Sequence, residues 1–534
     1  MTHQHLVVAR RRGGVHPFTS HSRARRLALL ASSATLAPIA LLALPSTAAA
    51  HAFGQAFQLP IPIWMMLSGA GLAVGASFVV AGMMVRSGGG LARYPSLRIP
   101  ALPARAMSLV IASIGLVWWY GAIVAAFVLG GATPIPTILF WIFIWAGLPI
   151  FSVLLGNPWP SLSPFRSTFS LLERLARFLG LDRLDLGLRY PARLARWPAV
   201  YLLFAGLWSE LVLPGAVEPG VIAFLMVGYT LIVLIGIACF GRVAWLRNAE
   251  LFEVLLGWFG RIGPVGRRVV DPNACAGCGE RCQPDRCIDC PECAAAAVAR
   301  ERRAELRPWV AGLTEVRRAG WSDAAFILLA LAGVTYDGLR ETNVWATASN
   351  WAFPYVYPRL DAFKAILVVG TAGLIAVWLA FIVAFLVTAG ITRLLSERAG
   401  ASGGLGSLVG AYAATLLPIA GGYMIAHYLT LVVQGIVWVP ELVRDPLAIT
   451  EPPVDMIPTA FVWYLSVAAI VLGHVAAIFL AHRIALRDAP ARPIRAGVPL
   501  AVLMITYTVV SLSIIAAPIA AEPGSPAVSA LTSD

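Results

Sequence analysis

The chain has 534 residues, of which 59% are hydrophobic and 13% are charged, and its formal net charge is +13. Soluble globular proteins carry about 25% charged residues, so this composition excludes a soluble multidomain protein. The positive charge comes almost entirely from arginine, because Lys364 is the only lysine. We expect the arginines to lie in loops between membrane helices, so the net charge predicts no nucleic-acid partner.

The first 50 residues have the pattern of a secretory signal peptide. A basic segment that ends at Arg26 precedes an apolar run over 27–44, and three alanines occupy 48–50. Small residues favour signal-peptidase cleavage, which predicts a mature chain beginning at His51. A free amine beside the imidazole of His51 would then form a chelating pair for copper. The alternative is an uncleaved first helix, because the apolar run is long for a signal.

Ten apolar runs follow, each long enough to cross about 30 Å of hydrocarbon. They cover 59–84, 106–130, 133–155, 197–215, 219–241, 321–339, 362–389, 408–438, 457–482 and 495–517. The expected fold class is all-α, a polytopic transmembrane helical bundle with about ten spans after a cleaved signal peptide. The expected partner of its surface is the lipid bilayer.

Arginines alternate with the predicted spans. With His51 outside, the predicted inner loops contain Arg86 to Arg105, Arg166 to Arg196, Arg242 to about Gly320, Arg393 with Arg398, and Arg483 to Arg495. The predicted outer loops are poor in arginine, except for the mixed loop after 321–339. The positive-inside rule thus predicts a multi-pass protein of the bacterial inner membrane with both mature termini outside.

The predicted organisation has four parts. They are a signal peptide at 1–50, a membrane domain at 51–263, a cytoplasmic cysteine-rich loop at 264–320 and a second membrane domain at 321–534. Two inner segments, 166–196 and 249–260, have apolar residues at helical spacing among charged ones. This spacing predicts amphipathic helices that lie on the inner leaflet.

Six of the seven cysteines lie together in the predicted cytoplasmic loop. They are Cys275, Cys278, Cys282, Cys287, Cys290 and Cys293, in the pattern C-x2-C-x3-C-x4-C-x2-C-x2-C. Cytoplasmic thiols stay reduced, and a C-x2-C pair brings two thiolates to one ion, so the pattern predicts a bound metal rather than disulfides. Zinc and an iron–sulfur cluster both fit this ligand set, and a relay of redox or metal-carrying thiols is a third interpretation.

The last three cysteines resemble the C-x2-C-x2-C run of bacterial ferredoxins. The Cys-Pro that would complete that run is missing, and Ala294 follows instead. One of the three earlier loop cysteines would then have to supply the fourth ligand.

Two histidines lie inside predicted spans, where ionisable side chains are costly and indicate function. They are His427, within 408–438, and His474, within 457–482. If these spans are antiparallel neighbours, the two imidazoles would face each other and hold haem iron, copper or zinc. The alternative is that each imidazole forms hydrogen bonds between helices.

Polar residues also collect at the predicted outer ends of two spans. Glu210 lies near the end of 197–215, whereas Asp337 and Arg340 lie near the end of 321–339. His51 is expected on the same side. These residues predict either an outward-facing polar site or an ion pair that fixes helix packing.

Short blocks spread over most of the chain resemble the fenitrothion hydrolase-like membrane proteins. The blocks are Thr335-Tyr336-Asp337-Gly338-Leu339 with Thr342 and Trp345, Asn157-Pro158-Trp159, Ile425-Ala426-His427-Tyr428, and Gly473-His474-Val475-Ala476 with Ala481-His482. The resemblance implies hydrolysis of organophosphate esters. The six-cysteine loop departs from that family's pattern, and the chain has neither a G-x-S-x-G nor an H-E-x-x-H motif.

Three functions therefore fit the sequence, and whether the protein is an enzyme stays open. The first is a metal- or redox-linked membrane protein that uses the cysteine loop and the intramembrane histidines, with a cytoplasmic redox or docking partner. The second is a transporter with Glu210 and Asp337 on its path. The third, implied by the resemblance, is a metal-dependent phosphotriester hydrolase.

Overall fold

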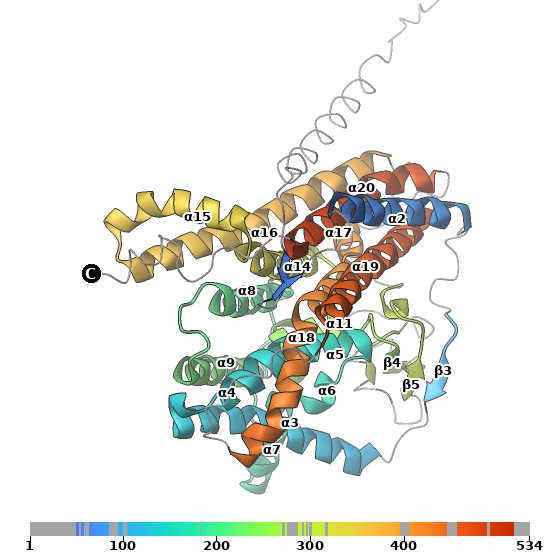
Figure 1. The fold of residues 1–534 in the computed structure, drawn as a ribbon. Helices are drawn as coiled ribbons and strands as arrows, with labels where there is room; N and C mark the ends of the chain where they lie inside the picture. Colours follow the sequence, from blue (N-terminus) through green and yellow to red (C-terminus); the bar gives the residue numbers. More distant parts are fainter. Residues whose placement is uncertain are drawn as a thin grey trace, which may run out of the picture. The chain divides into compact units, whose positions relative to one another are not determined.

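The computed structural model describes fifteen segments of the chain. They are 50–52, 55–57, 63–84, 94–99, 104–181, 183–269, 273–274, 287–290, 293–294, 297, 302–314, 319–395, 405–445, 457–488 and 492–516. Residues 1–49 of the predicted signal peptide lie outside these segments, as do Cys275, Cys278 and Cys282. Helices dominate the described part (Figure 1).

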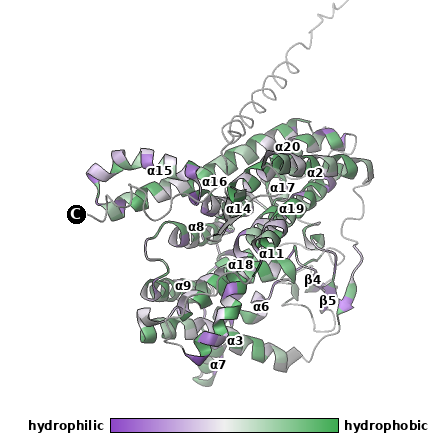
Figure 2. Ribbon diagram, viewed as in Figure 1, coloured by the Kyte–Doolittle hydropathy of each residue, from purple (hydrophilic) through white to green (hydrophobic). Residues whose placement is uncertain are grey.

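Nine helices in the described segments are long and apolar enough to cross a membrane. They lie in α2 (Ile63–Met84), α3 (Ala104–Leu129), the continuous α4–η2–α5 segment (Ile135–Thr137, Ile138–Gly147, Leu148–Leu154), α9 (Pro219–Phe240), α14 (Trp321–Arg340), α16 (Ala362–Leu395), α17–α18 (Leu405–Ala414, Leu417–Arg444), α19 (Thr459–Asp488) and α20 (Pro493–Ala516). Apolar residues cover these helices (Figure 2), and side chains such as Leu72, Val117 and Phe224 are exposed on them. The chain is therefore a multi-pass membrane protein, because only lipid can cover so much exposed apolar surface.

The tenth predicted span, 197–215, forms a shorter helix, α8 (Trp197–Leu211). Its 15 residues reach only about 22 Å, which is less than the hydrocarbon thickness of about 30 Å. Arg196, just before α8, lines the same cavity as Leu155, just after α5. At the other end of α8, the carbonyl of Ala216 accepts a hydrogen bond from Trp141 of η2 at 2.9 Å. The short helix α8 thus runs antiparallel to most of the η2–α5 span.

Small residues allow α18 and α19 to approach closely. A Cβ added to Gly422 would lie 2.4 Å from the carbonyl oxygen of Ala469, and one added to Gly473 would lie 2.5 Å from that of Pro418. Helices in a bilayer gain no hydrophobic driving force from each other, so close backbone packing of this kind stabilises their contact. The two contacts also fix the register of α18 against α19.

Several short elements lie outside the membrane-length helices. A three-stranded antiparallel sheet has the order β3 (Leu97–Ile99), β5 (Arg302–Leu306), β4 (Val265–Val269). The short helices are α6 (Trp159–Leu162), α7 (Pro164–Phe178), α10 (Arg242–Asn248), α11 (Leu251–Phe259) and α15 (Asn343–Val356), and a hairpin joins β1 (Ala50–Ala52) to β2 (Gln55–Phe57). The sheet pairs the cysteine-rich loop at 264–320 with the chain just before α3.

The two segments predicted to be amphipathic behave differently. Helix α7 buries Phe169 but leaves Leu172 and Leu175 exposed, so part of its apolar surface is available to lipid. Helix α11, in contrast, does not lie on the surface, because every residue in it except Gly257 is buried. The spacing of its apolar residues predicted one buried face, whereas neighbouring elements bury α11 on all sides.

Candidate metal centre and intramembrane polar cluster

The three loop cysteines in the described segments converge on one point. The Sγ atoms of Cys287, Cys290 and Cys293 lie within 4.8 Å of one another, and all three residues are buried. No two of them form a disulfide. Tetrahedral zinc–thiolate bonds of about 2.3 Å place ligand sulfurs about 3.8 Å apart. The three thiols would therefore need to move little to bind one metal ion.

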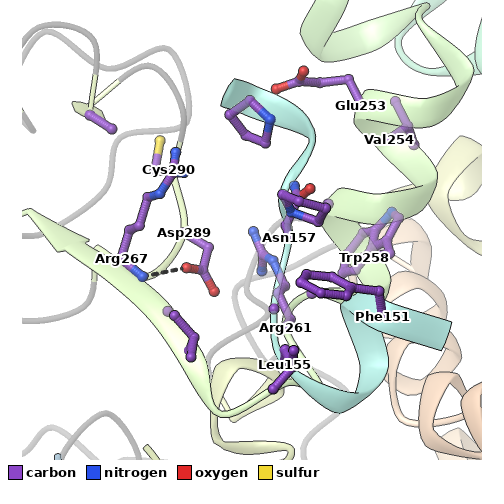
Figure 3. Close-up of a pocket in the computed structure, with 18 of the residues that line it drawn as sticks. Phe151, Leu155, Asn157, Glu253, Val254, Trp258, Arg261, Arg267, Asp289 and Cys290 are labelled. Carbon is purple, nitrogen blue, oxygen red and sulfur yellow. Dashed lines mark hydrogen bonds between the residues drawn. The ribbon is translucent and has the colours of Figure 1, made fainter. Parts of the chain in front are cut away.

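Asp289 anchors this cysteine segment to the sheet. Its backbone lies in the left-handed region with φ +49°, which Asp tolerates better than most residues. Its amide donates to the carbonyl of Arg267 at 2.9 Å, and its Oδ1 accepts from the Arg267 amide at 2.7 Å (Figure 3). Its Oδ2 accepts from Nη2 of Arg307 at 2.6 Å. These contacts hold the segment that carries the thiols of Cys287, Cys290 and Cys293 against β4.

A cavity of about 560 Å³ lies between the cysteine segment and the helical bundle (Figure 3). Arg267, Asp289 and Cys290 lie on one side of it in this view, and Phe151 and Trp258 lie on the other. Sites for small molecules have volumes of roughly 300–1,000 Å³. The cavity is therefore large enough for a small molecule beside the candidate metal centre.

A buried carboxylate, Glu250, caps the start of α11. Its Oε1 accepts from the amide of Phe252 at 3.0 Å, and its Oε2 accepts from the amide of Glu253 at 2.6 Å. Nε1 of Trp159 donates to Oε2 at 2.8 Å, and the Tyr229 hydroxyl donates to Oε1. Burial raises the pKa of Glu250 to about 7. Glu250 thus joins α9, α6 and α11 through one side chain.

The helices α8, α14 and α18 bring a second polar group together. Nε2 of His427 lies 2.9 Å from Oδ2 of Asp337. The hydroxyl of Tyr428 donates to the same oxygen at 2.5 Å and lies 3.4 Å from Oε1 of Glu210. Oε2 of Glu210 is buried and has no hydrogen-bond partner among the described residues. We call His427, Asp337, Tyr428 and Glu210 the intramembrane cluster.

The intramembrane cluster contains two residues of the expected outer-face site and one expected metal ligand. Glu210 and Asp337 were expected near each other, and they meet through Tyr428. His427 pairs with Asp337 instead of a second histidine. The sequence did not single out Tyr428 as a site residue. A buried tyrosine that forms hydrogen bonds has the same sequence pattern as one that only packs against its neighbours.

His474 does not join this cluster. Its ring is fully buried, and its Nδ1 lies 2.8 Å from the carbonyl of Ile470 on its own helix. Oγ of Ser466 donates to the carbonyl of Ala426 at 3.0 Å, which places Ser466 level with the residue before His427. Residue 474 lies eight positions beyond 466, or about 12 Å along the helix axis. The register therefore does not bring the two imidazoles together.

The other two residues of the expected outer-face site are Arg340 and His51. Arg340 ends α14 near the cluster, and its charge acts on Glu210 and Asp337, although it forms neither an ion pair nor a hydrogen bond with a residue that the structure describes. His51 lies in β1, where it pairs with Ala56 of β2, and its side chain is outside the described part.

Comparison with known proteins gives no match: no protein-family model, no curated protein and no solved structure matches this chain. The resemblance to the fenitrothion hydrolase-like proteins therefore stays a prediction. The function has to be inferred from the thiols, the cavity and the intramembrane cluster.

Proposed function

We propose that this chain is a metal-linked multi-pass membrane protein, with a thiolate-bound metal centre held against its helical bundle. The observation that carries the proposal is the convergence of three buried thiols within 4.8 Å. Cys287, Cys290 and Cys293 would supply three ligands, and one of the earlier loop cysteines would supply the fourth. Zinc and an iron–sulfur cluster both accept such a set.

The two metals imply different roles for the loop. An iron–sulfur cluster makes the loop a redox module that exchanges electrons with a cytoplasmic partner. Zinc makes it a structural or docking module, because zinc has no redox chemistry and its binding energy is folding energy. In either case Asp289 and Arg307 would hold the centre against the membrane domain.

The proposal is tested by elemental analysis and an absorption spectrum of the full chain, purified in detergent without oxygen. Iron with a broad visible band, lost in a Cys287→Ser/Cys290→Ser variant, identifies an iron–sulfur centre. Zinc without a visible band, lost in the same variant, identifies a zinc site. Cys239→Ser is the matched control, because Cys239 lies in α9. A wild-type chain without metal would overturn the proposal, and a sharp Soret band would point to haem at His427 or His474.

We further propose that the cysteine loop faces the cytoplasm and that α8 makes a tenth crossing. The arginine-rich loops support this orientation. The antiparallel course of α8 along η2–α5 supports the extra crossing. With ten crossings both mature ends lie outside. A membrane-impermeant thiol reagent should then label the loop cysteines only after the membrane is opened and the metal is removed.

A second candidate function is a proton-coupled transporter, and the intramembrane cluster favours it. The Tyr428 hydroxyl has a single proton, so it donates to only one of the carboxylates of Asp337 and Glu210 at a time. The shorter contact is with Asp337, so Glu210 would carry a proton and donate it to the hydroxyl oxygen. Such chains of ionisable groups mark proton paths in membranes. Proteoliposomes under an imposed potential should take up protons, and Asp337→Asn should abolish this uptake.

The third candidate, phosphotriester hydrolysis, is supported by the resemblance alone. Among the described residues, the three cysteines are the only group of three potential ligands that one ion can reach. A four-thiolate site is closed, whereas a hydrolytic metal needs an open position for water. Turnover of fenitrothion that a chelator abolishes would support this function against the first two.

A further inference from the structure

The cavity beside the cysteine segment has a cationic lining. Its basic residues are Arg196, Arg247, Arg261 and Arg267. Its acidic residues are Glu253 and Asp289, and arginines outside the lining already neutralise both. Nη2 of Arg166 lies 3.0 Å from Glu253, and Nη2 of Arg307 lies 2.6 Å from Asp289. The lining therefore has an excess of positive charge.

Two of these arginines are available to a ligand. The guanidinium of Arg261 lies over the ring of Trp258 at 5.1 Å and forms no ion pair or hydrogen bond with any residue in the described segments. Arg267 contacts Asp289 through its backbone amide, while its side chain is exposed and has no described partner. Arg196, by contrast, pairs with Asp323 at 2.5 Å. An anion in the cavity would thus meet two guanidinium groups that no carboxylate neutralises.

The rest of the lining is largely apolar. Phe151 and Leu155 come from the end of α5, and Val254 and Trp258 come from α11. A small inorganic ion would leave this apolar surface in contact with water, whereas a ligand with an apolar part would cover it. The cavity also lies at the end of a membrane-length helix, where lipid headgroups meet protein.

We propose that this cavity binds an anionic amphiphile. Its phosphate or carboxylate group lies between Arg261 and Arg267, and its apolar part packs against Phe151, Leu155 and Trp258. Arginine suits this task because its planar donors fit phosphate and carboxylate oxygens. The source of such a ligand is an anionic lipid of the inner leaflet, because a soluble phosphomonoester such as glycerol 3-phosphate has no apolar part.

This site goes beyond the proposed metal centre and does not depend on which metal is bound. Cys290 lines the same cavity, so the ligand would contact the segment that carries the thiols. Metal content and ligand binding can be measured separately on the same purified chain. A variant that keeps its full metal content but no longer binds the amphiphile therefore tests the cavity separately from the metal centre.

The first test fills the cavity. Gly257 lines it from α11, and a Cβ added there would meet no atom within 4 Å. Gly257→Phe should therefore occupy the cavity while the helix is kept, since most residues favour helix more than glycine does. Gly121→Phe is the matched control, because a Cβ on Gly121 of α3 also meets no atom within 4 Å and the residue does not line the cavity.

The second test removes the charge. Arg261→Gln/Arg267→Gln takes two positive charges from the cavity, and Arg189→Gln/Arg193→Gln takes two from exposed positions outside it. Each charge-assisted contact to phosphate contributes about a factor of ten to affinity. We therefore expect the cavity variant to bind at least tenfold more weakly and the control to bind within twofold of the wild type.

Binding is measured by native mass spectrometry of the full chain titrated with dioleoyl phosphatidylglycerol, dioleoyl phosphatidylcholine or glycerol 3-phosphate. Preference for phosphatidylglycerol, lost in both cavity variants and kept in both controls, supports a lipid site. Binding of glycerol 3-phosphate with the same pattern, without preference for phosphatidylglycerol, overturns the amphiphile proposal and leaves a plain anion site. Equal binding of the two lipids without binding of glycerol 3-phosphate, or unchanged binding by the Arg261→Gln/Arg267→Gln variant, overturns the proposal.

Discussion

Nη2 of Arg307 donates to Oδ2 of Asp289 at 2.6 Å, and this contact ties the cysteine segment to the helical bundle. The Arg307 side chain has no exposed surface, and it also donates to the carbonyls of Gly260 and Gly263 at the end of α11. Gly266 is required beside it, because a Cβ there would lie 2.3 Å from Nη1. Arg307 thus links β4 and α11 to Asp289, which lies between the candidate metal ligands Cys287 and Cys290.

We predict that Asp289→Asn lowers both stability and metal content. The substitution removes the closest counter-ion of the buried Arg307 charge and leaves only Glu305, whose Oε1 lies 3.9 Å from Nη1, so the loss approaches the roughly 3–5 kcal/mol of a broken buried pair. The measurements are thermal unfolding in detergent and metal bound per chain. Asp361→Asn is the control, because the pair of Asp361 with Lys364 is exposed and its loss should leave both values unchanged. An Asp289→Asn chain with wild-type metal content would show that the thiols are positioned independently of Arg307.

We predict that stability falls as the pH rises through about 7, because of Glu250. Burial raises the pKa of this carboxyl from 4.5 to about 7, so the native state binds its proton more tightly than the unfolded state does. The resulting stabilisation is complete below pH 4.5 and is lost as the pH rises through about 7. Its full size is on the order of 3 kcal/mol.

The measurement for Glu250 is the unfolding temperature between pH 5 and pH 8 in the wild type and in Glu250→Gln. The amide does not titrate, so the slope with pH should be smaller in the variant. Glu253 and Tyr229 face the same carboxyl and influence it, so the control is Glu218→Gln, at an exposed residue before α9. Identical slopes in wild type and Glu250→Gln would assign the pH dependence to other groups.

The membrane helices could be predicted from the sequence because a bilayer imposes a length and a polarity on each of them. The nine membrane-length helices fall on predicted apolar runs. The run at 197–215 shows the limit of this argument. It is apolar enough for a span, but Pro214 and Gly215 lie in the turn that follows α8, so the helix stops at Leu211.

The side-chain contacts could be predicted only in part. The C-x2-C-x2-C spacing acts within a few residues, so it predicts that Cys287, Cys290 and Cys293 converge whatever surrounds them. The partner of His427 depends on the register of three helices, which hydropathy does not encode. The sequence therefore suggested His474 as the partner of His427, whereas in the structure Asp337 is its partner.

We predict that Glu210 is protonated at neutral pH in the membrane. The Tyr428 hydroxyl donates to Asp337, so the contact with Glu210 is favourable only if Glu210 donates in return. In a Glu250→Gln background, which removes the carboxyl whose pKa burial raises to about 7, infrared spectra should show a carboxylic-acid carbonyl band that Glu210→Gln removes and Asp337→Asn leaves in place. Glu218→Gln, at an exposed residue before α9, is the control. If the band survives Glu210→Gln, the proton lies elsewhere and the proton-path argument fails.

We predict that the α18–α19 contact tolerates no added side chain at Gly422. A Cβ there would lie 2.4 Å from a backbone oxygen of Ala469, and a backbone atom cannot move aside as a flexible side chain can. Gly422→Leu should therefore destabilise the protein by about 1–3 kcal/mol or more, as overpacking does in other cores. Gly390→Leu in α16 should have little effect, because a Cβ on Gly390 meets no atom within 4 Å. Thermal unfolding of both variants in one detergent compares them directly. Equal unfolding temperatures would mean that α18 and α19 pack less closely than these contacts require, and the register that separates His427 from His474 would then lose its support.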